Sequence, residues 1–191
     1  MSPNDIQGFL EKRIIVFDGA MGTELYNRHH FVNVCFEELS VSKPGVVREI
    51  HEENKAAGAD VLTTNSFGAN RYKLGGFLLG DRVSEIAEAA ARTAREAAGD
   101  SRYVAGSVGP LGRFIGDGGI PENDAVEAFR EPIRGLAAGG ADFIIFETFS
   151  RRRELLAAAK AATLEGVPYV PSMAFSELNM TRGGERLEEF Y

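Results

Sequence analysis

The sequence contains one cysteine, Cys35, and no apolar run long enough to cross a membrane. A single cysteine excludes an internal disulfide and a zinc knuckle built from several cysteines, and it fits a reducing compartment. Residues 1–7 lack the basic start and long apolar run of a secretory leader. We therefore expect a cytoplasmic protein that has no membrane partner.

Positive charge is also scarce. The chain has 21 Lys and Arg against 28 Asp and Glu, which gives a formal net charge of -7 and a pI near 5.1. Because nucleic acids and anionic membrane surfaces repel such a chain, we expect neither as a partner and favour small-molecule chemistry. The 191 residues are 44% hydrophobic and 26% charged, which indicates one globular unit with a substantial core.

What the chain does contain is an alternation of strand and helix patterns, beginning at residues 13–25. Four consecutive apolar residues end there on Asp18 and a glycine-punctuated turn. This pattern predicts a strand buried on both faces that presents one carboxylate at its tip. We expect further strands at residues 59–65, 102–107, 141–147 and 167–175, and helices at 42–57, 81–98, 126–136, 151–163 and from 185 to the end of the chain.

Several boundaries carry specific expectations. Ser42 should cap the helix that follows it, where Pro44 suits the first turn, and Ser150 should cap a later helix. Pro132 lies inside a helical pattern and should kink or break it. The remaining segments, at residues 26–40, 66–74 and 108–121, are expected to be loops.

An internal repeat relates two of the strands. Residues 57–67 and 139–149 share one plan: a helix-ending glycine, Ala-Asp, four strand residues, a polar tip and an aromatic residue. Aligning the other strands on this frame places Asp18, Asn65, Ser107 and Glu147 at equivalent strand ends. In a parallel sheet these ends share one face, where barrels and open α/β sheets bind their ligands.

Strict alternation of strand and helix indicates a parallel sheet, but spacing alone fixes neither strand order nor closure. The first strand is not followed by Gly-x-Gly-x-x-Gly, which weighs against a dinucleotide-binding sheet and favours a barrel. A closed (β/α)8 barrel takes about 250 residues. We therefore expect an α/β fold of the TIM-barrel type in which residues 1–191 form an incomplete single domain with only the first five βα units.

Asp18 and Glu147 should be partly desolvated carboxylates that need a cation. They could receive a ligand ammonium group or act as an acid/base pair; alternatively, each could cap a helix or accept loop amides. Their coincidence on one face favours a functional role.

The glycines after the strands could form anion-binding nests or simply permit tight turns. His29 and His30 lie in a polar segment and are expected at the surface rather than at a metal.

Five phrases follow one another along the chain. They are Asp-Gly-Ala-Met-Gly-Thr-Glu-Leu at 18–25, Cys-Phe-Glu-Glu-Leu at 35–39, Thr-Thr-Asn-Ser-Phe-Gly-Ala-Asn-Arg-Tyr-Lys-Leu at 63–74, Ser-Val-Gly-Pro at 107–110 and Phe-Glu-Thr-Phe at 146–149. In this order they resemble the homocysteine-binding methyltransferase barrel, and the similarity runs from about residue 13 to the end of the chain. This module forms the N-terminal part of cobalamin-dependent methionine synthase and occurs in other homocysteine S-methyltransferases.

The resemblance implies a role for particular residues. Asp18 and Glu147 match the family's amino-acid-binding positions and would hold the substrate ammonium group, while amides near Gly19 and Thr148 would contact its carboxylate. Two further residues would line the cavity, Asn65 and Phe67. The substrate implied is homocysteine, whose methylation gives methionine.

The family activates the homocysteine sulfur with zinc, which lowers the pKa of the thiol. Its three zinc cysteines follow later strands of the barrel, so we expect no zinc ligand and no catalytic residue within residues 1–191, and Cys35 matches none of the three. Cobalamin and methyltetrahydrofolate would be bound by other modules. The implied partners are homocysteine and a methyl donor or its carrier module. A second chain that completes the barrel is a further partner that the sequence leaves open.

Two other functions stay open at this point. A truncated barrel could be a non-catalytic binding or assembly fragment, which the missing zinc cysteines favour for residues 1–191 alone. A lyase or aldolase barrel could use Asp18 and Glu147 as acid and base, although the ordered phrases make this the weakest of the three.

Overall fold

The computed structural model describes residues 8, 14–31 and 33–190. Expectations for residues 1–7, Arg13 and Tyr191 lie outside the described residues. The described strands β1 (Val61–Thr63), β2 (Tyr103–Val108), β3 (Phe143–Phe149) and β4 (Tyr169–Met173) form one sheet in the order β1-β2-β3-β4, and every pair is parallel. Each strand therefore lies beside the previous one, as in a barrel, without the reversal of strand order that marks a doubly wound sheet.

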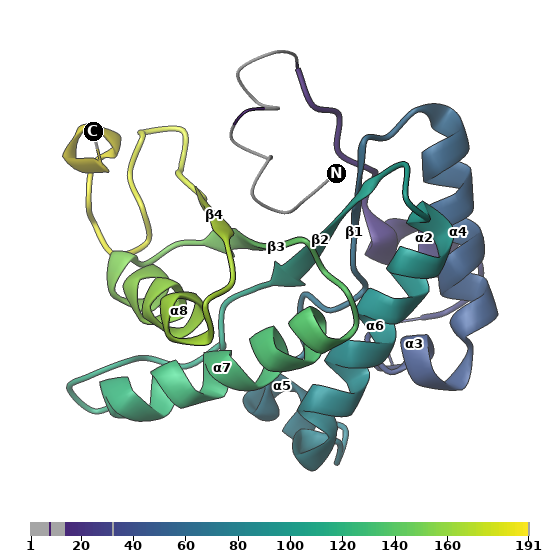
Figure 1. Ribbon diagram of the computed structural model, residues 1–191. Coiled ribbons are helices and arrows are strands. Elements are labelled where there is room, and N and C mark those ends of the chain that lie inside the picture. Colours follow the sequence, from purple (N-terminus) through teal and green to yellow (C-terminus); the bar gives the residue numbers. More distant parts are fainter. Residues whose placement is uncertain (1–7, 9–13, 32, 191) are drawn as a thin grey trace.

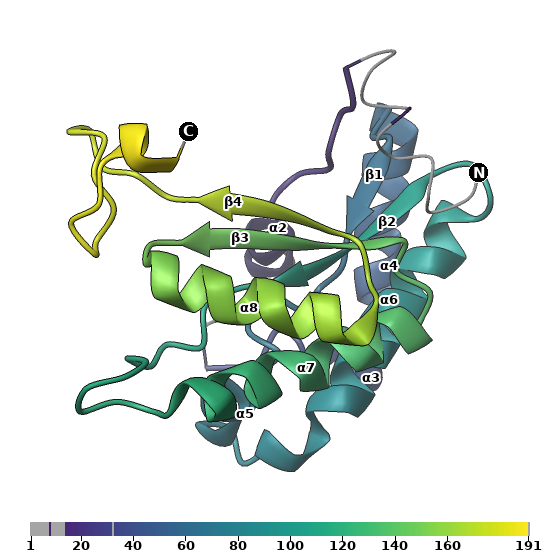
Figure 2. The same ribbon diagram turned by 60° about the vertical axis from the view of Figure 1, so that its left-hand side comes forward.

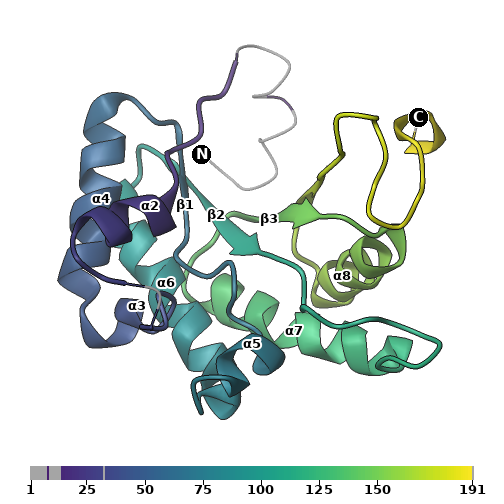
Figure 3. The same ribbon diagram turned by 180° about the vertical axis from the view of Figure 1, so that it is seen from behind.

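Four long helices cover one side of this sheet. They are α4 (Pro44–Ala57), α6 (Val83–Ala98), α7 (Glu122–Ala138) and α8 (Arg152–Glu165). Helix α6 packs against both α4 and α7, and α7 packs against α8, so the helices follow one another around the outside of a curved sheet (Figure 3). No helix in the described part of the chain is long and apolar enough to cross a membrane.

The ends of the long helices follow from their sequences. Pro44 opens α4, where its missing N–H costs no hydrogen bond, and Gly58 ends it with φ 107°. Helix α6 follows the single 3₁₀ turn η2 (Gly80–Arg82).

The predicted break at Pro132 is wrong, because α7 runs continuously from Glu122 to Ala138. Pro132 removes one backbone donor, and buried neighbours on the same helix, Phe129 and Ile133, hold both sides in the core.

The main core lies between the sheet and the helices, where β3 turns apolar side chains toward α7 and α8. Figure 1 and Figure 2 show this layer from two directions, with β3 and β4 side by side next to α8. Its largest fully buried members are Phe129, Ile133, Leu136, Ile144, Phe146 and Phe149. The other side of the sheet carries a smaller cluster of buried residues, Val61, Tyr103, Ala105 and Phe143.

The prediction of a first strand buried on both faces is wrong. Ile14 is 88% exposed, Val16 52% and Phe17 40%, and the segment makes one isolated parallel bridge, from Phe17 to Val61. The expectation of five full strands is therefore corrected to four strands and this bridge among the described residues. The physical reason is that no described strand flanks the far side of residues 14–17, so their apolar side chains stay uncovered.

Two of the predicted loops contain short helices, so these loop predictions are wrong in part. Helix α2 (Met21–Asn27) covers the predicted turn after Asp18 and the start of the first loop, α3 (Leu39–Ser42) begins at the end of that loop, and the second loop holds α5 (Arg71–Gly75). Helix α5 begins at Asn70, whose Oδ1 accepts hydrogen bonds from the N–H groups of Tyr72 and Lys73 at 3.1 Å. A single buried leucine anchors α2, and another anchors α5, too few to give a periodic sequence pattern.

The predicted serine caps are also wrong. Ser42 is the last residue of α3, its hydroxyl donates to Glu38, and Lys43 takes the capping position of α4. Arg151, not Ser150, precedes the first turn of α8. The expected final helix is only the one-turn 3₁₀ segment η3 (Leu187–Phe190). Ser42 cannot cap α4 because it still belongs to α3, and α8 starts one residue later than predicted, after Arg151 in extended conformation.

Candidate functional site

A hollow of about 580 Å³ lies at the carboxyl ends of the strands. All of the residues predicted to bind substrate line it, together with Ser107 from β2. They come from the segment after Phe17, from the chain beyond β1 and from the end of β3: Asp18, Gly19, Asn65, Phe67, Glu147 and Thr148. The predicted convergence of the strand ends is therefore present in the structure.

Asp18 is the most perturbed carboxyl group of this hollow. Its side chain is only 2% exposed, and its Oδ2 accepts a hydrogen bond from the N–H of Thr63 at 2.8 Å. Burial raises the pKa of Asp18 to about 6, hydrogen bonds with Thr63 oppose this shift, and the charge of Glu147 adds to it. The bridge at Phe17 and the bond from Asp18 N–H to the carbonyl of Val61 fix the position of the residue.

Glu147 reaches the hollow by the alternation of β3, in which Phe143 and Ile145 face the inner side of the sheet while Ile144 and Phe146 face the helices. A bulge follows at the end of the strand. The pairing of β3 with β4 shifts between Phe146 and Phe149, and Thr148 between them has φ 64°, in the left-handed region. Phe146 and Phe149 both pack in the core on the helix side, which normal alternation would not allow for residues three apart. The extra residue thus turns Phe149 into the core, while Glu147 stays on the open side of the sheet with Phe143 and Ile145.

A chain of hydroxyl groups connects the neighbouring strand ends to Glu147. The side chains of Thr64 and Ser66 share a hydrogen bond of 2.6 Å, and Ser66 donates to the carbonyl of Ser107 at 2.7 Å. Ser107 N–H donates to Thr64 Oγ1 at 2.9 Å, and the Ser107 hydroxyl donates to Glu147 Oε1. The chain after β1 and the end of β2 are thereby fixed relative to one carboxylate on β3.

Asn65 and Phe67 line the hollow in different ways. The Asn65 amide nitrogen donates to the carbonyl of Phe36 at 2.6 Å and lies 3.2 Å from Ser40 Oγ, so this group holds the chain around residues 36–40. Phe67 is 39% exposed, with Lys73 Nζ 4.5 Å from its ring centre. A Cβ on Gly109 would lie 2.4 Å from the Phe67 ring, so only glycine fits there. Phe149, the repeat equivalent of Phe67, is fully buried instead.

The described residues do not form a metal site. No three or more His, Cys, Asp or Glu side chains among them lie close enough together to hold an ion. Cys35 is buried, its Sγ lies 3.4 Å from Glu37 Oε2, and burial raises the pKa of its thiol to about 11. A metal-binding cysteine has to be a thiolate, so this environment opposes zinc.

His51 is a neighbour of the site that the sequence analysis did not single out. It lies on α4, its side chain is fully buried, and its Nδ1 is 3.9 Å from Asp18 Oδ2. Burial lowers the pKa of His51 to about 4, so the ring is neutral at physiological pH. The signal available in the sequence was its spacing of four residues from Val47, on the apolar face of the helix.

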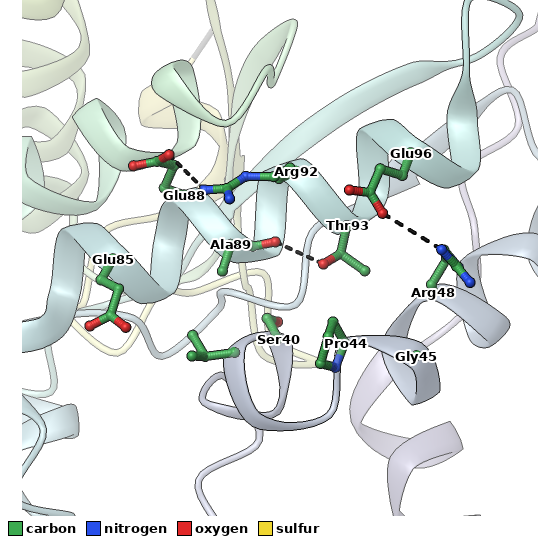
Figure 4. Close-up of a pocket in the computed structure, with 11 residues that line it drawn as sticks. Ser40, Pro44, Gly45, Arg48, Glu85, Glu88, Ala89, Arg92, Thr93 and Glu96 are labelled. Atoms are coloured by element: carbon green, nitrogen blue, oxygen red, sulfur yellow. Dashed lines mark hydrogen bonds and ion pairs between the residues drawn. The ribbon is translucent and has the colours of Figure 1, made fainter.

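A larger hollow, of about 780 Å³, lies away from the strand ends, between α6 and the segment from α3 to the start of α4 (Figure 4). Its charged side chains already pair with each other. Arg92 contacts Glu88 at 2.6 Å and Arg48 contacts Glu96 at 3.8 Å. The remaining charged residue of its lining, Glu85, pairs with Arg82 at 2.7 Å, and this exposed ion pair lowers the pKa of Glu85. Because all of these charges are paired at the surface, this hollow is a weaker candidate site than the smaller one.

A parallel sheet wound in chain order, with carboxylates at the carboxyl ends of its strands, defines a barrel-type ligand-binding protein. The family model for homocysteine S-methyltransferases matches residues 15–191, and the chain belongs to this family. Similar structures include the metallated form of the homocysteine methyltransferase MmuM from Escherichia coli, with a TM-score of 0.84 and 25% identity over 98% of this chain and 72% of that one.

Two methionine synthases are also similar. That of Mycobacterium tuberculosis is 34% identical over 97% of this chain, and that of Mycobacterium leprae is 32% identical over 81%. The chain spans only 15% and 14% of the length of these two proteins. The barrel expectation is thus confirmed at the level of family and fold.

Proposed function

We propose that residues 1–191 are the N-terminal portion of a homocysteine-binding methyltransferase barrel and bind the amino-acid end of homocysteine, whose methylation gives methionine. The observation that carries this proposal is the position of Asp18 and Glu147 at one hollow, where neither forms an ion pair with a described lysine or arginine. Two carboxylates without a protein cation are suited to a substrate ammonium group.

Each residue of the hollow has a role in this proposal. Asp18 and Glu147 accept hydrogen bonds from the ammonium group, and the backbone N–H groups of Gly19 and Thr148 donate to the substrate carboxylate. Asn65 and Phe67 line the cavity beside them. The bulge at Thr148 supports this assignment, because backbone in an uncommon conformation is concentrated at functional sites.

The described residues are not suited to bind the zinc that would activate the sulfur. They contain no cluster of metal ligands, and burial keeps the Cys35 thiol protonated. We therefore propose no zinc-dependent step and no catalytic residue among them. No residue is assigned to cobalamin or methyltetrahydrofolate either. A methyl donor or its carrier module, and a cytoplasmic location consistent with the unpaired Cys35, complete the proposal.

Calorimetric titration of the 191-residue chain tests the binding step. We expect L-homocysteine to bind and 4-mercaptobutanoate, which lacks the ammonium group, not to bind. Asp18→Asn and Glu147→Gln should each weaken homocysteine binding about tenfold or more, because each removes a charge-assisted hydrogen bond. Glu122→Gln, at an exposed position of α7, is the matched control and should leave affinity unchanged. Unchanged affinity in Glu147→Gln would remove that residue from the proposal.

Elemental analysis tests the metal assignment. The purified chain should carry no stoichiometric zinc, with or without homocysteine. Stoichiometric zinc would mean that ligands such as Cys35 and His29 bind it after all, and the metal site would have to be reassigned. Homocysteine binding without methyl transfer in the full-length protein would instead favour a non-catalytic binding unit.

A further inference from the structure

His51 has two polar atoms that the fold leaves without a partner. Its side chain is fully buried in the middle of α4, and neither Nδ1 nor Nε2 forms a hydrogen bond to any described residue. Such atoms are rare in folded proteins because a buried donor or acceptor has lost its water without gaining a replacement. The nearest carboxylate oxygen is Asp18 Oδ2, at 3.9 Å from Nδ1, which is too long for a hydrogen bond.

The charges around the ring are those of the proposed binding site. Asp18 faces it from the segment after Phe17, and Glu147 on β3 is close enough to Asp18 to raise its pKa. On α4 itself the acidic Glu53 is directed to Arg28 at the surface. No described cation pairs with either site carboxylate. A neutral imidazole carries one N–H donor and one acceptor, so His51 can donate to Asp18 without becoming charged.

We infer that His51 is a positioning residue for Asp18: its Nδ1–H donates to Asp18 Oδ2 when the ammonium group of an amino acid occupies the hollow. This inference rests on the proposed function. Closing 3.9 Å to a hydrogen bond of about 2.9 Å needs a movement of about 1 Å. Thr63 N–H already donates to the same oxygen at 2.8 Å. The two donors fix Oδ2 and leave Oδ1 for the ligand.

The bond depends on the ligand for an electrostatic reason. An ionised carboxylate is a stronger acceptor than a protonated one, and in the empty hollow burial raises the pKa of Asp18 to about 6, so a fraction of these carboxyl groups stays protonated near neutral pH. An ammonium group in contact with Asp18 keeps it ionised. His51 then gains the partner that the empty site does not give it.

Three substitutions of His51 separate donation from packing. His51→Asn places an N–H near the position of Nδ1, His51→Gln places one near Nε2, and His51→Leu fills the space without a donor. By calorimetry at pH 7, we expect His51→Leu and His51→Gln to bind L-homocysteine about tenfold more weakly than the natural chain, and His51→Asn to bind within about threefold of it. In addition, the pH below which affinity falls should rise in His51→Leu and stay unchanged in His51→Asn.

A merely structural role predicts another pattern: stability would change in all three variants, while the pH profile of binding would not move. That result, or equal losses of affinity in His51→Leu and His51→Asn when both are folded by circular dichroism, would overturn the inference. If His51→Leu does not fold, nitrogen-15 NMR of the natural chain decides instead. Homocysteine should produce the Nδ1–H tautomer with a proton shifted downfield, and an Nε2–H tautomer in the bound state would exclude the donation.

The same titrations distinguish this inference from the proposed function. If Asp18→Asn and Glu147→Gln weaken binding but His51→Leu does not, only the role of His51 is wrong. If the natural chain does not bind homocysteine, or binds it unchanged after Asp18→Asn, the proposed function fails and the inference fails with it.

Discussion

Asp18 makes the stability of the folded chain depend on pH in an unusual direction, because burial is the largest cause of its shifted pKa. The pKa is about 6 in the folded chain against 3.8 for an unperturbed aspartate. Between these two values the folded chain holds a proton that the unfolded chain has released. The free energy of unfolding therefore falls as pH rises through this window and stays lower above pH 6.

Asp18→Asn should abolish this dependence. We expect the variant to be more stable than the natural chain by about 2 kcal/mol at pH 7, and the difference should disappear near pH 4. Urea unfolding at a series of pH values from 4 to 7 measures it. The lowered pKa of His51 acts in the opposite direction but is common to both chains, so it largely cancels in the comparison. Asp117→Asn, in an exposed loop, is the control, and a gain independent of pH would contradict the prediction.

Thr148 stores backbone strain at the site, because a β-branched residue with φ 64° crowds its own backbone. Thr148→Gly should therefore stabilise the chain by about 1 kcal/mol. Thr163→Gly on α8 is the matched control, where the same change should destabilise by about 0.3 kcal/mol because glycine is a poorer helix former than threonine. Opposite signs in urea unfolding are expected. Loss of stability in both variants would show that Thr148 is not strained.

The sequence predicted Asp18 and Glu147 because each follows an apolar run at the point where a strand should end. It did not predict the bulge, since the residues 146–149 read equally well as regular alternation. His51 was missed for a related reason. A histidine among valine and isoleucine at helical spacing is an ordinary core residue until a carboxylate from another element is placed beside it.

At the scale of elements, two glycines allow α7 to pack closely against α6: Gly135 within α7 and Gly139 directly after its last residue. A Cβ on Gly135 would lie 2.5 Å from the carbonyl oxygen of Ser84, and one on Gly139 would lie 2.4 Å from that of Glu88. Both contacts are to helix backbone or to its small side chains, which cannot rotate away. The close approach of the helices therefore depends on the absence of side chains at these positions.

Gly135→Ala should destabilise the chain by about 1–3 kcal/mol, although alanine is the better helix former, because overpacking forces the helices apart. Gly45→Ala on α4, where a Cβ would meet nothing within 4 Å, is the matched control and should raise stability by about 0.5 kcal/mol. Urea unfolding of both variants measures the difference. If Gly135→Ala were also stabilising, the contact between α6 and α7 would be looser than the structure describes.

The long helices could be predicted because each buries a repeated apolar face, and β2 and β3 because each is a mostly buried apolar run. Helix α6 buries nine residues at helical spacing, and its predicted end at Gly99 is the observed one. The short helices α2, α3 and α5 bury one or two residues each, so they depend on tertiary contacts that no local pattern records. The serine caps failed for the same reason, since a cap is defined by backbone conformation rather than by residue type alone.

At the scale of the whole molecule, the sheet has a helix-covered side and a side that is only partly covered. On the latter, Ile145 and Val170 are half-buried against the inner cluster, while Ile14, Val16 and Phe17 are mostly exposed. No described strand pairs with the outer edge of β4. Exposed apolar surface next to an unpaired strand edge favours association between chains.

We therefore expect the 191-residue chain to self-associate as its concentration rises, with the inner face of the sheet in the contact. Val170→Lys places a charge on that face beside the free edge and should shift the chain toward monomer. Leu78→Lys adds the same charge at a residue that is 95% exposed and outside the sheet, and it should leave association unchanged. Sedimentation velocity at several concentrations measures both variants, with circular dichroism to verify folding. A natural chain that stays monomeric at all concentrations would show that the inner face is stable in contact with water. Equal effects of the two lysines would show that the contact between chains does not involve this face.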